Sequence, residues 1–205
     1  SSQEIIGERI TNYQTTIELD RTGQAAIQEE VTYDFKDQAR TGITHTLTPS
    51  INLGGYFPAA RGLTIQPILR NGETEPTRFL STNRELLIRT GERNRPVTDK
   101  QTYRIPSLVT LFVERNGQKA LVHFRITDDA RVIPIDRAEL TVHGPTAPLT
   151  ANCYIGTKEG RQTYSCRTTR DGLTTRFSTI RWLDPGEYLF IELEEKALSC
   201  AEAYK

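Results

Sequence analysis

An alternation of apolar and polar residues with a period of two runs through TTIELDRTGQAAIQEEVTYDF, residues 15–35, and it limits the possible folds more than any other feature. Successive side chains of a β-strand point to opposite sides, so this period is typical of strands with one buried face. Asp20 and Gly23 interrupt the pattern, and both are common in hairpin turns. We therefore predict a β-hairpin here, whose buried face carries Ile17, Leu19, Ile27, Val31 and Tyr33.

Similar strand-like runs follow almost to the end of the chain, and most of them end at Asn-Gly, Gly or Asp. They are LTIQPILRNG, RELLIRTG, QTYRIPSLVTLFVERNG, KALVHFRIT, RAELTVHG, TANCYIG, QTYSCRTT, TTRFSTIRW and EYLFIELEE. Together with the hairpin they give about eleven strands, with no long helical period between them. We therefore expect an all-β fold, an antiparallel β-sandwich of the immunoglobulin-like kind, as one unit or as two packed sandwich-like halves.

The same pattern sets the expected domain limits. One domain is expected over residues 1–198, with a sub-boundary at 144–150, where Pro145 and Pro148 interrupt the strand-like segments. Residues 199–205 are expected to form a polar tail or the start of a linker, although EEKALSCAEAYK has a helix-forming composition. The chain contains no methionine, and we expect it to be a fragment or a processed form.

The segment from residue 36 to residue 61 contains two prolines and a Gly-Gly pair, and it predicts one connection of unusual length. Long connections often carry binding surfaces, so Tyr56 and Phe57 could form an exposed aromatic platform for a sugar or a peptide. Aromatic side chains bury a large area, so a place in the core is the alternative for both residues. For Trp182, which precedes a Pro-Gly turn, we expect a place in the core.

Two of the three cysteines, Cys153 and Cys166, flank the turn-like segment GTKEGRQ. A hairpin at this turn would bring them side by side, within reach of a disulfide, which would indicate an oxidising compartment. The alternatives are two buried thiols, a metal site or a catalytic thiol, and a metal site would need two further ligands. Cys200 is left as a free thiol or as a partner for a cysteine of a second chain.

The charges balance, with 26 basic and 26 acidic residues, so the sequence does not favour nucleic acid as a partner. One local excess of positive charge lies in RELLIRTGERNR, which could hold a phosphate or an acidic polymer, because guanidinium groups bind oxyanions through two hydrogen bonds. A solvated hairpin tip is the alternative, since Glu85 and Glu92 offset part of the charge. The candidate binding residues are Arg84, Arg89, Arg93 and Arg95.

Asp128, Asp129 and Asp136 surround ARVIPI and are weak candidates for calcium ligands, because calcium prefers carboxylate and carbonyl oxygens on loops. Their spacing differs from that of an EF-hand, and aspartates next to turns are common structural devices. We therefore expect turns here and predict no metal and no cofactor.

The sequence also lacks the Gly-x-Ser-x-Gly, His-Glu-x-x-His and phosphate-loop motifs of common enzyme classes. We therefore expect a protein that is not an enzyme. The alternative is a cell-envelope carbohydrate-active enzyme or hydrolase whose carboxylates are scattered along the sequence.

Several segments of the chain resemble the extracytoplasmic domain of the YciQ-like predicted membrane proteins, the domain-of-unknown-function family 2207. They are ERITNYQTTIELDRTGQAAIQEEVTYDF, TGITHTLTP, ALVHFRITDDARVIPIDRAELTVHGP, the pair CYIG and C, and LDPGEYLFIELE. The resemblance implies a signal peptide before the domain, a transmembrane helix after it, and no established activity. It also places the domain on the extracytoplasmic side of the cell membrane.

We therefore expect a binding, sensing or assembly module of a membrane-anchored bacterial protein. Its expected partner is a cell-envelope protein or glycan.

Overall fold

The computed structural model describes residues 7–47, 61–81, 86–110, 114–116, 119–126, 133–157, 162–163 and 166–196, and every element in this part of the chain is a β-strand. The strands are β1 (Arg9–Leu19), β2 (Gln24–Asp34), β3 (Thr44–Leu47), β4 (Arg61–Ile65), β5 (Leu69–Arg70), β6 (Glu73–Thr74), β7 (Thr77–Ser81), β8 (Leu86–Thr90), β9 (Lys100–Thr110), β10 (Glu114–Asn116), β11 (Lys119–Ile126), β12 (Ala138–His143), β13 (Thr150–Gly156), β14 (Gln162–Thr163), β15 (Cys166–Asp171), β16 (Thr174–Thr179) and β17 (Tyr188–Lys196).

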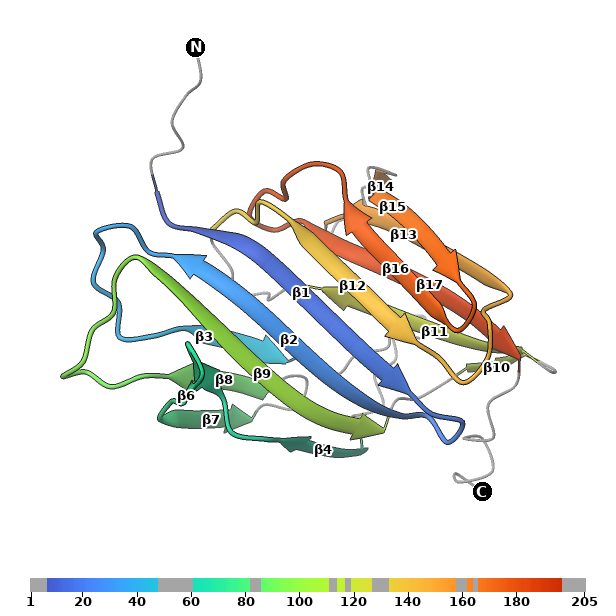
Figure 1. Ribbon diagram of the computed structural model, residues 1–205, viewed down its shortest axis with the longest axis horizontal. Helices are drawn as coiled ribbons and strands as arrows, with labels where there is room; N and C mark the ends of the chain where they lie inside the picture. Colours follow the sequence, from blue (N-terminus) through green and yellow to red (C-terminus); the bar gives the residue numbers. More distant parts are fainter. Residues whose placement is uncertain are drawn as a thin grey trace, which may run out of the picture.

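A nine-stranded sheet forms one layer of the molecule. Its strand order is β15-β16-β12-β1-β2-β9-β5-β6, and β4 also pairs with β9. All of its pairs are antiparallel except β1 with β12, which run parallel from Tyr13↔Ala138 to Glu18↔His143. The pairing of these two strands brings the beginning of the chain into the centre of the sheet, next to a strand from its second half (Figure 1).

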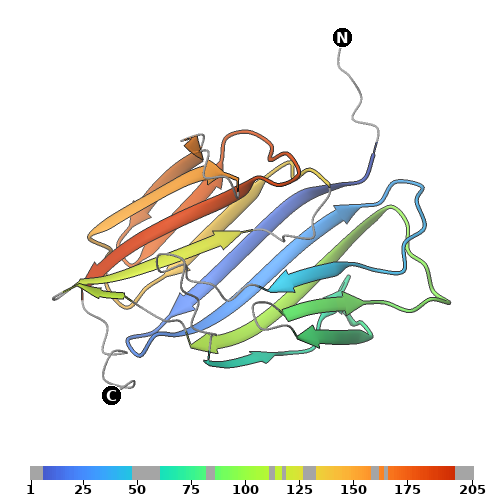
Figure 2. The ribbon, with the colours of Figure 1, turned by 180° about the vertical axis from the view of Figure 1, so that it is seen from behind.

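Two smaller sheets form the second layer, and they lie side by side behind the large sheet (Figures 1 and 2). One has five strands in the order β10-β11-β17-β13-β14, and the other has three in the order β3-β8-β7. The inner faces of the sheets share one hydrophobic core, to which Ile105, Leu140, Phe177, Leu183 and Leu189 each contribute a fully buried side chain. This arrangement confirms the predicted all-β, mainly antiparallel, sandwich-like fold.

The predicted first hairpin is confirmed as β1 and β2. Asp20 follows the last residue of β1, and its Oδ1 accepts hydrogen bonds from the backbone N–H groups of Thr22 (2.8 Å) and Gln24 (3.0 Å). Gly23 adopts a φ of 84°, which a residue without a Cβ reaches at little cost. The alternation also predicts the buried side correctly, because Ile17, Leu19, Ile27, Val31 and Tyr33 are all buried.

The composition of residues 36–61 predicts one continuous connection, but this prediction is wrong. Residues 44–47 form β3, which pairs with β8 from Thr44↔Arg89 to Leu47↔Leu86. The sequence THTL lacks an apolar alternation, because the side chain that β3 turns inward is that of His45, which is buried. Tyr56 and Phe57 lie outside the described residues.

The expected sub-boundary at 144–150 is the segment in which the chain passes between layers. It joins β12 of the nine-stranded sheet to β13 of the five-stranded sheet. Further along, β16 returns to pair with β12. At the C-terminal end, β17 extends to Lys196, and residues 199–205 lie outside the described residues.

Candidate functional site

Three polar side chains meet in the core between the nine-stranded and the three-stranded sheets. Tyr13 of β1 and Glu29 of β2 occupy inward positions of the alternating pattern, and His45 of β3 approaches from the other layer. The Tyr13 hydroxyl donates a hydrogen bond to Oε2 of Glu29, and Nε2 of His45 lies 3.2 Å from the same oxygen. We call Tyr13, Glu29 and His45 the buried triad.

The electrostatics of the buried triad favour an ionised carboxylate. Burial by itself raises the pKa of Glu29, but the charge of His45 and the hydrogen bonds from His45 and Tyr13 outweigh it, so the pKa lies below its usual value. The exposed fractions are 2% for Tyr13, 5% for Glu29 and 1% for His45. The triad therefore has the residue types of an acid–base site, but its groups face one another and not the solvent.

No motif in the sequence singles out the buried triad, although one signal is present. In the run Ile27-Gln28-Glu29-Glu30-Val31, the period of two places Glu29 on the same face as two apolar neighbours. A carboxylate in the buried phase of a strand needs a partner, because an unpaired buried charge is costly. The partner itself, His45, comes from another sheet and could not be identified from local sequence.

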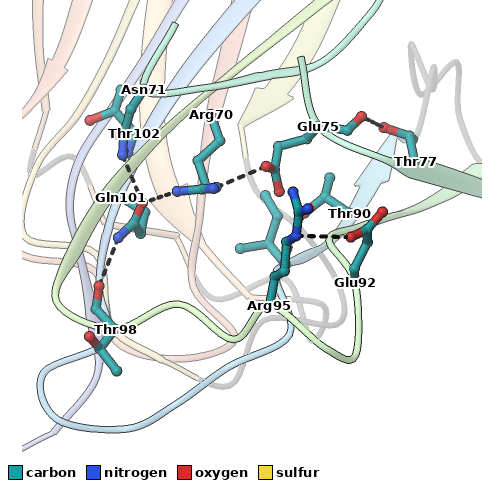
Figure 3. A network of polar contacts seen from close by, with 11 residues as sticks. Arg70, Asn71, Glu75, Thr77, Thr90, Glu92, Arg95, Thr98, Gln101 and Thr102 are labelled. Carbon is teal, nitrogen blue, oxygen red and sulfur yellow. Dashed lines mark hydrogen bonds and ion pairs between the residues drawn. The ribbon is translucent and has the colours of Figure 1, made fainter. Parts of the chain in front are cut away.

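A second polar network lies where β5 meets β9 (Figure 3). Nε of Arg70 is 2.9 Å from Oε1 of Glu75, and NH1 of Arg70 donates to Oε1 of Gln101 at 2.9 Å. Nδ2 of Asn71 donates to the same Gln101 oxygen at 2.8 Å, while its Oδ1 accepts from the backbone N–H of Thr102 at 2.9 Å. These contacts hold the short β5–β6 hairpin against the long strand β9.

Tyr103 of β9 lies beside this network and is fully buried. Burial raises the pKa of its phenol to about 12, and the Glu75 carboxylate adds to the rise, whereas Arg70 and the Thr90 hydroxyl act in the opposite direction. The Thr90 hydroxyl on β8 also accepts a hydrogen bond from the backbone N–H of Ile43 at 3.1 Å. The Thr90 hydroxyl thus ties the end of β8 to the residue that precedes β3.

The arginines of the predicted basic patch lie on and after β8. Arg89 lies on the outer side of β8, whereas Arg93 and Arg95 follow the strand, and all three are exposed. Nε of Arg95 lies 3.7 Å from Oε2 of Glu92, so part of the charge is offset. Arg84 lies outside the described residues. Arg78 of β7, which the sequence did not single out, is directly opposite Arg89.

Cys153 and Cys166 form a disulfide, with their Cα atoms 6.2 Å apart. The sequence predicts that the two cysteines lie across one hairpin, and this part of the prediction is wrong. Cys153 is on β13 of the five-stranded sheet, whereas Cys166 begins β15 of the nine-stranded sheet, because the chain changes layers after β14. The bond therefore links the two layers of the sandwich.

Of the three aspartates considered as calcium ligands, only Asp136 lies within the described residues. Its Oδ1 accepts hydrogen bonds from Nε (2.6 Å) and NH2 of Arg9, so its charge is paired with a guanidinium. Asp128 and Asp129 lie outside the described part. Within that part, no group of three or more His, Cys, Asp or Glu side chains is placed to hold a metal ion.

A place in the core was expected for Trp182, but this prediction is wrong, because the residue is 57% exposed. The next residue, Leu183, takes the buried position and exchanges backbone hydrogen bonds with Ile135. Arg181 holds the turn in place, because NH1 and NH2 donate to the two carboxylate oxygens of Glu187 at 2.9 and 2.8 Å. This turn therefore presents an indole to the solvent on a well-supported backbone.

The sequence of this chain matches a known family over most of its length. The family model, described as the predicted membrane protein (DUF2207) N-terminal domain, covers residues 9–193. The chain belongs to this family. The resemblance noted from the sequence is thereby confirmed, and membership associates the domain with a predicted membrane protein. No curated protein matches the sequence.

Solved structures with a similar fold share little sequence with this chain. Native yeast LTA4 hydrolase superposes with a TM-score of 0.57 at 8% identity, covering 92% of this chain and 29% of that chain. Native leukotriene A4 hydrolase from Saccharomyces cerevisiae gives 0.53 at 10% identity, with coverage of 92% and 29%. The M1 zinc metallopeptidase from Deinococcus radiodurans gives 0.48 at 13% identity, covering 91% of this chain and 42% of that chain.

This chain spans less than half the length of each of these proteins. At such low identity, the two yeast structures establish a shared fold and nothing more. Among the described residues, no helix has the length and apolar character needed to cross a membrane.

Proposed function

We propose that this domain is a non-enzymatic binding, sensing or assembly module on the extracytoplasmic side of a membrane-anchored bacterial protein. The natural gene product would begin with a signal peptide and carry its anchor outside the sequence shown here. Its partner would be a cell-envelope protein or glycan, and not a nucleic acid. Membership of a predicted membrane protein family is the starting point for this proposal.

The disulfide between Cys153 and Cys166 is the observation that carries the extracytoplasmic location. Disulfides form and persist mainly in oxidising compartments, whereas the cytosol keeps thiols reduced. The bond joins two strands of different layers, so its loss would remove a covalent link between the layers. A bond with this structural role supports folding in an oxidising compartment.

The burial of the triad supports a non-enzymatic role. Tyr13, Glu29 and His45 combine an acid, a base and a hydroxyl, but each is at most 5% exposed and their polar atoms contact one another. A substrate needs access to a general acid or base within hydrogen-bond distance. The features exposed to a partner are instead the arginines of the three-stranded sheet and the turn that carries Trp182.

The location can be tested on the full-length gene product in cells. Intact cells are treated with a protease that does not cross the membrane, and a second sample is opened before digestion. We expect the domain to be cut in intact cells or spheroplasts, and Cys153 and Cys166 to resist alkylation until a reductant is added. Protection of the domain until the membrane is opened, together with two freely alkylated thiols, would contradict the proposed location.

The non-enzymatic role can be tested with purified full-length protein incubated with isolated cell-envelope polysaccharide and peptidoglycan. We expect neither new reducing ends nor new amino groups to appear. Glu29→Gln serves as the matched variant, because it replaces the buried carboxylate with an amide of similar size. Release of products by the wild type would establish a hydrolase and overturn this part of the proposal, and its loss in folded Glu29→Gln protein would place the activity at the triad.

A further inference from the structure

We infer that the outer face of the three-stranded sheet binds a phosphoryl oxyanion through Arg78, Arg89 and Thr44. This inference rests on the proposed binding function and gives it a ligand class. The three residues come from three neighbouring strands, β7, β8 and β3, and they form one row across the sheet. We call them the oxyanion row.

The pairing register places the oxyanion row in a line. Arg78 is directly opposite Arg89 in the β7–β8 pair, and Arg89 is directly opposite Thr44 in the β8–β3 pair. Side chains at directly opposite positions of antiparallel strands have Cβ atoms roughly 5 Å apart and share one face. On β8 the neighbours of Arg89, Ile88 and Thr90, are buried, so Arg89 and its row face the solvent.

The charge of the row is uncompensated within the described residues. Neither the Arg78 nor the Arg89 side chain makes a hydrogen bond or an ion pair there, while Glu92 is engaged with Arg95 and Glu75 with Arg70. Like charges at directly opposite positions of a sheet are destabilising. Local features that oppose stability are expected at functional sites, and a bound anion would remove this repulsion.

The backbone around the row is held in place by close packing. Gly91 follows β8 with a φ of 95°, and a Cβ at this position would lie 1.8 Å from the carbonyl oxygen of Thr41. The backbone N–H of Gly91 also donates to the carbonyl of Pro76 at 2.9 Å. The segments before β3 and before β7 are thereby fixed to the end of β8. Arg89 is one residue before the last residue of this strand, Thr90.

The chemistry of the row suits a phosphoryl group. Two guanidinium groups supply planar pairs of N–H donors that match the oxygens of one anion, and a hydroxyl adds a further donor. Inorganic phosphate, a phosphate ester and the phosphodiester of an anionic lipid all present this group.

The first test is calorimetric titration of the protein with inorganic phosphate at constant ionic strength, because salt screens such contacts. We expect Arg78→Gln and Arg89→Gln each to weaken binding by about tenfold, the value of one charge-assisted hydrogen bond at its lower limit. Arg176→Gln is the matched control, since Arg176 is exposed on β16 but lies opposite Thr141 and Thr169. No binding by the wild type, or equal weakening in Arg176→Gln, would overturn the inference.

A melting experiment separates binding from misfolding. Without ligand, Arg89→Gln is expected to melt at the same temperature as the wild type or higher, because it removes one of two like charges at directly opposite positions. Phosphate stabilises most proteins by exclusion from their surface, so the relevant quantity is the excess shift of the wild type over the Arg78→Gln/Arg89→Gln variant. Equal shifts in the two proteins would count against a site at this row.

A third arm identifies the source of the phosphoryl group, using vesicles of phosphatidylglycerol and of phosphatidylcholine. Cosedimentation with phosphatidylglycerol that depends on both arginines would support the site with a lipid as its ligand. Binding of inorganic phosphate without vesicle binding would support it with a soluble or polymer-linked phosphate. Vesicle binding that is unchanged in the double variant would contradict a lipid as the ligand of this row. The compartment tests do not use phosphate, so either proposal can fail alone.

Discussion

Nε2 of His45 on β3 lies 3.2 Å from Oε2 of Glu29 on β2, and this contact joins two sheets through an ion pair in the core. Both side chains are almost completely buried. Removing one partner of such a pair leaves an uncompensated buried charge, which costs more than the intact pair contributes. The contact therefore makes the position of the three-stranded sheet sensitive to single substitutions.

We expect His45→Ala to lower the free energy of unfolding by roughly 3–5 kcal/mol, the usual cost of breaking a buried ion pair. His143→Ala is the matched control, since His143 is half-buried and its Nε2 lies 3.7 Å from Glu18 Oε1 at the surface. The control should lose at most about 1 kcal/mol. Urea denaturation measures both values, and equal losses would show that the ion pair has no special role.

The pH dependence of stability should report the ionisation of Glu29. The pKa of Glu29 in the folded state lies below the usual value of 4.5. The ionised carboxylate therefore contributes its full stabilisation above pH 4.5, and this stabilisation is lost as the pH falls through the lowered pKa. Glu29→Gln removes this contribution, so the stability difference between wild type and variant should shrink on acidification. A difference that stays constant from neutral to acidic pH would show that Glu29 is not held ionised.

Glu195 on β17 should show the opposite dependence. Burial raises its pKa, and a hydrogen bond from the Thr146 hydroxyl, 3.2 Å from Oε2, only partly offsets this. A raised carboxyl pKa makes the folded state bind more protons, so stability decreases as the pH rises from 4.5 through the raised value. Glu195→Gln should therefore be more stabilising, relative to wild type, at neutral than at acidic pH, as measured by thermal melting at both.

Loss of the disulfide should destabilise the sandwich by about 3 kcal/mol, the chain-entropy value for a loop of this size. Its cysteines are 13 positions apart. Cys153→Ala/Cys166→Ala should unfold at the same urea concentration as the reduced wild type, and reductant should not affect the variant. Cys200→Ala controls for the third thiol. A reductant effect that persists in the double variant would show that another bond is responsible.

Local sequence predicts the strands well because burial on one face leaves a period of two. The period of two correctly predicts the hairpin of β1 and β2, with its buried Val31 and its turn at Asp20 and Gly23. The period does not predict β3, because the inward side chain of that strand is a histidine whose partner is Glu29 in another sheet. The two-residue strands β5, β6 and β14 are too short to carry any period.

The candidate sites are harder to predict from local sequence than the strands, because they form where distant strands pair. The Cys153–Cys166 bond was expected, but not its span between layers, since the crossing after β14 leaves no local signal. The sequence predicts Arg89 as a candidate binding residue, whereas Arg78 becomes a candidate only because the strand register places it opposite Arg89. Trp182 illustrates the converse, because size alone favoured burial and the adjacent Leu183 occupied the buried position.

Arg9 and Asp136 pair across 127 positions, at the start of the parallel β1–β12 contact. As the chain emerges from the ribosome or from a translocation channel, β1 can pair with β2 long before β12 has appeared. Contacts between such distant segments slow folding, and an open strand edge invites association with other chains. We therefore expect nascent forms that end before residue 138 to need a chaperone on the free side of β1, and chains that end after β12 to depend on one less.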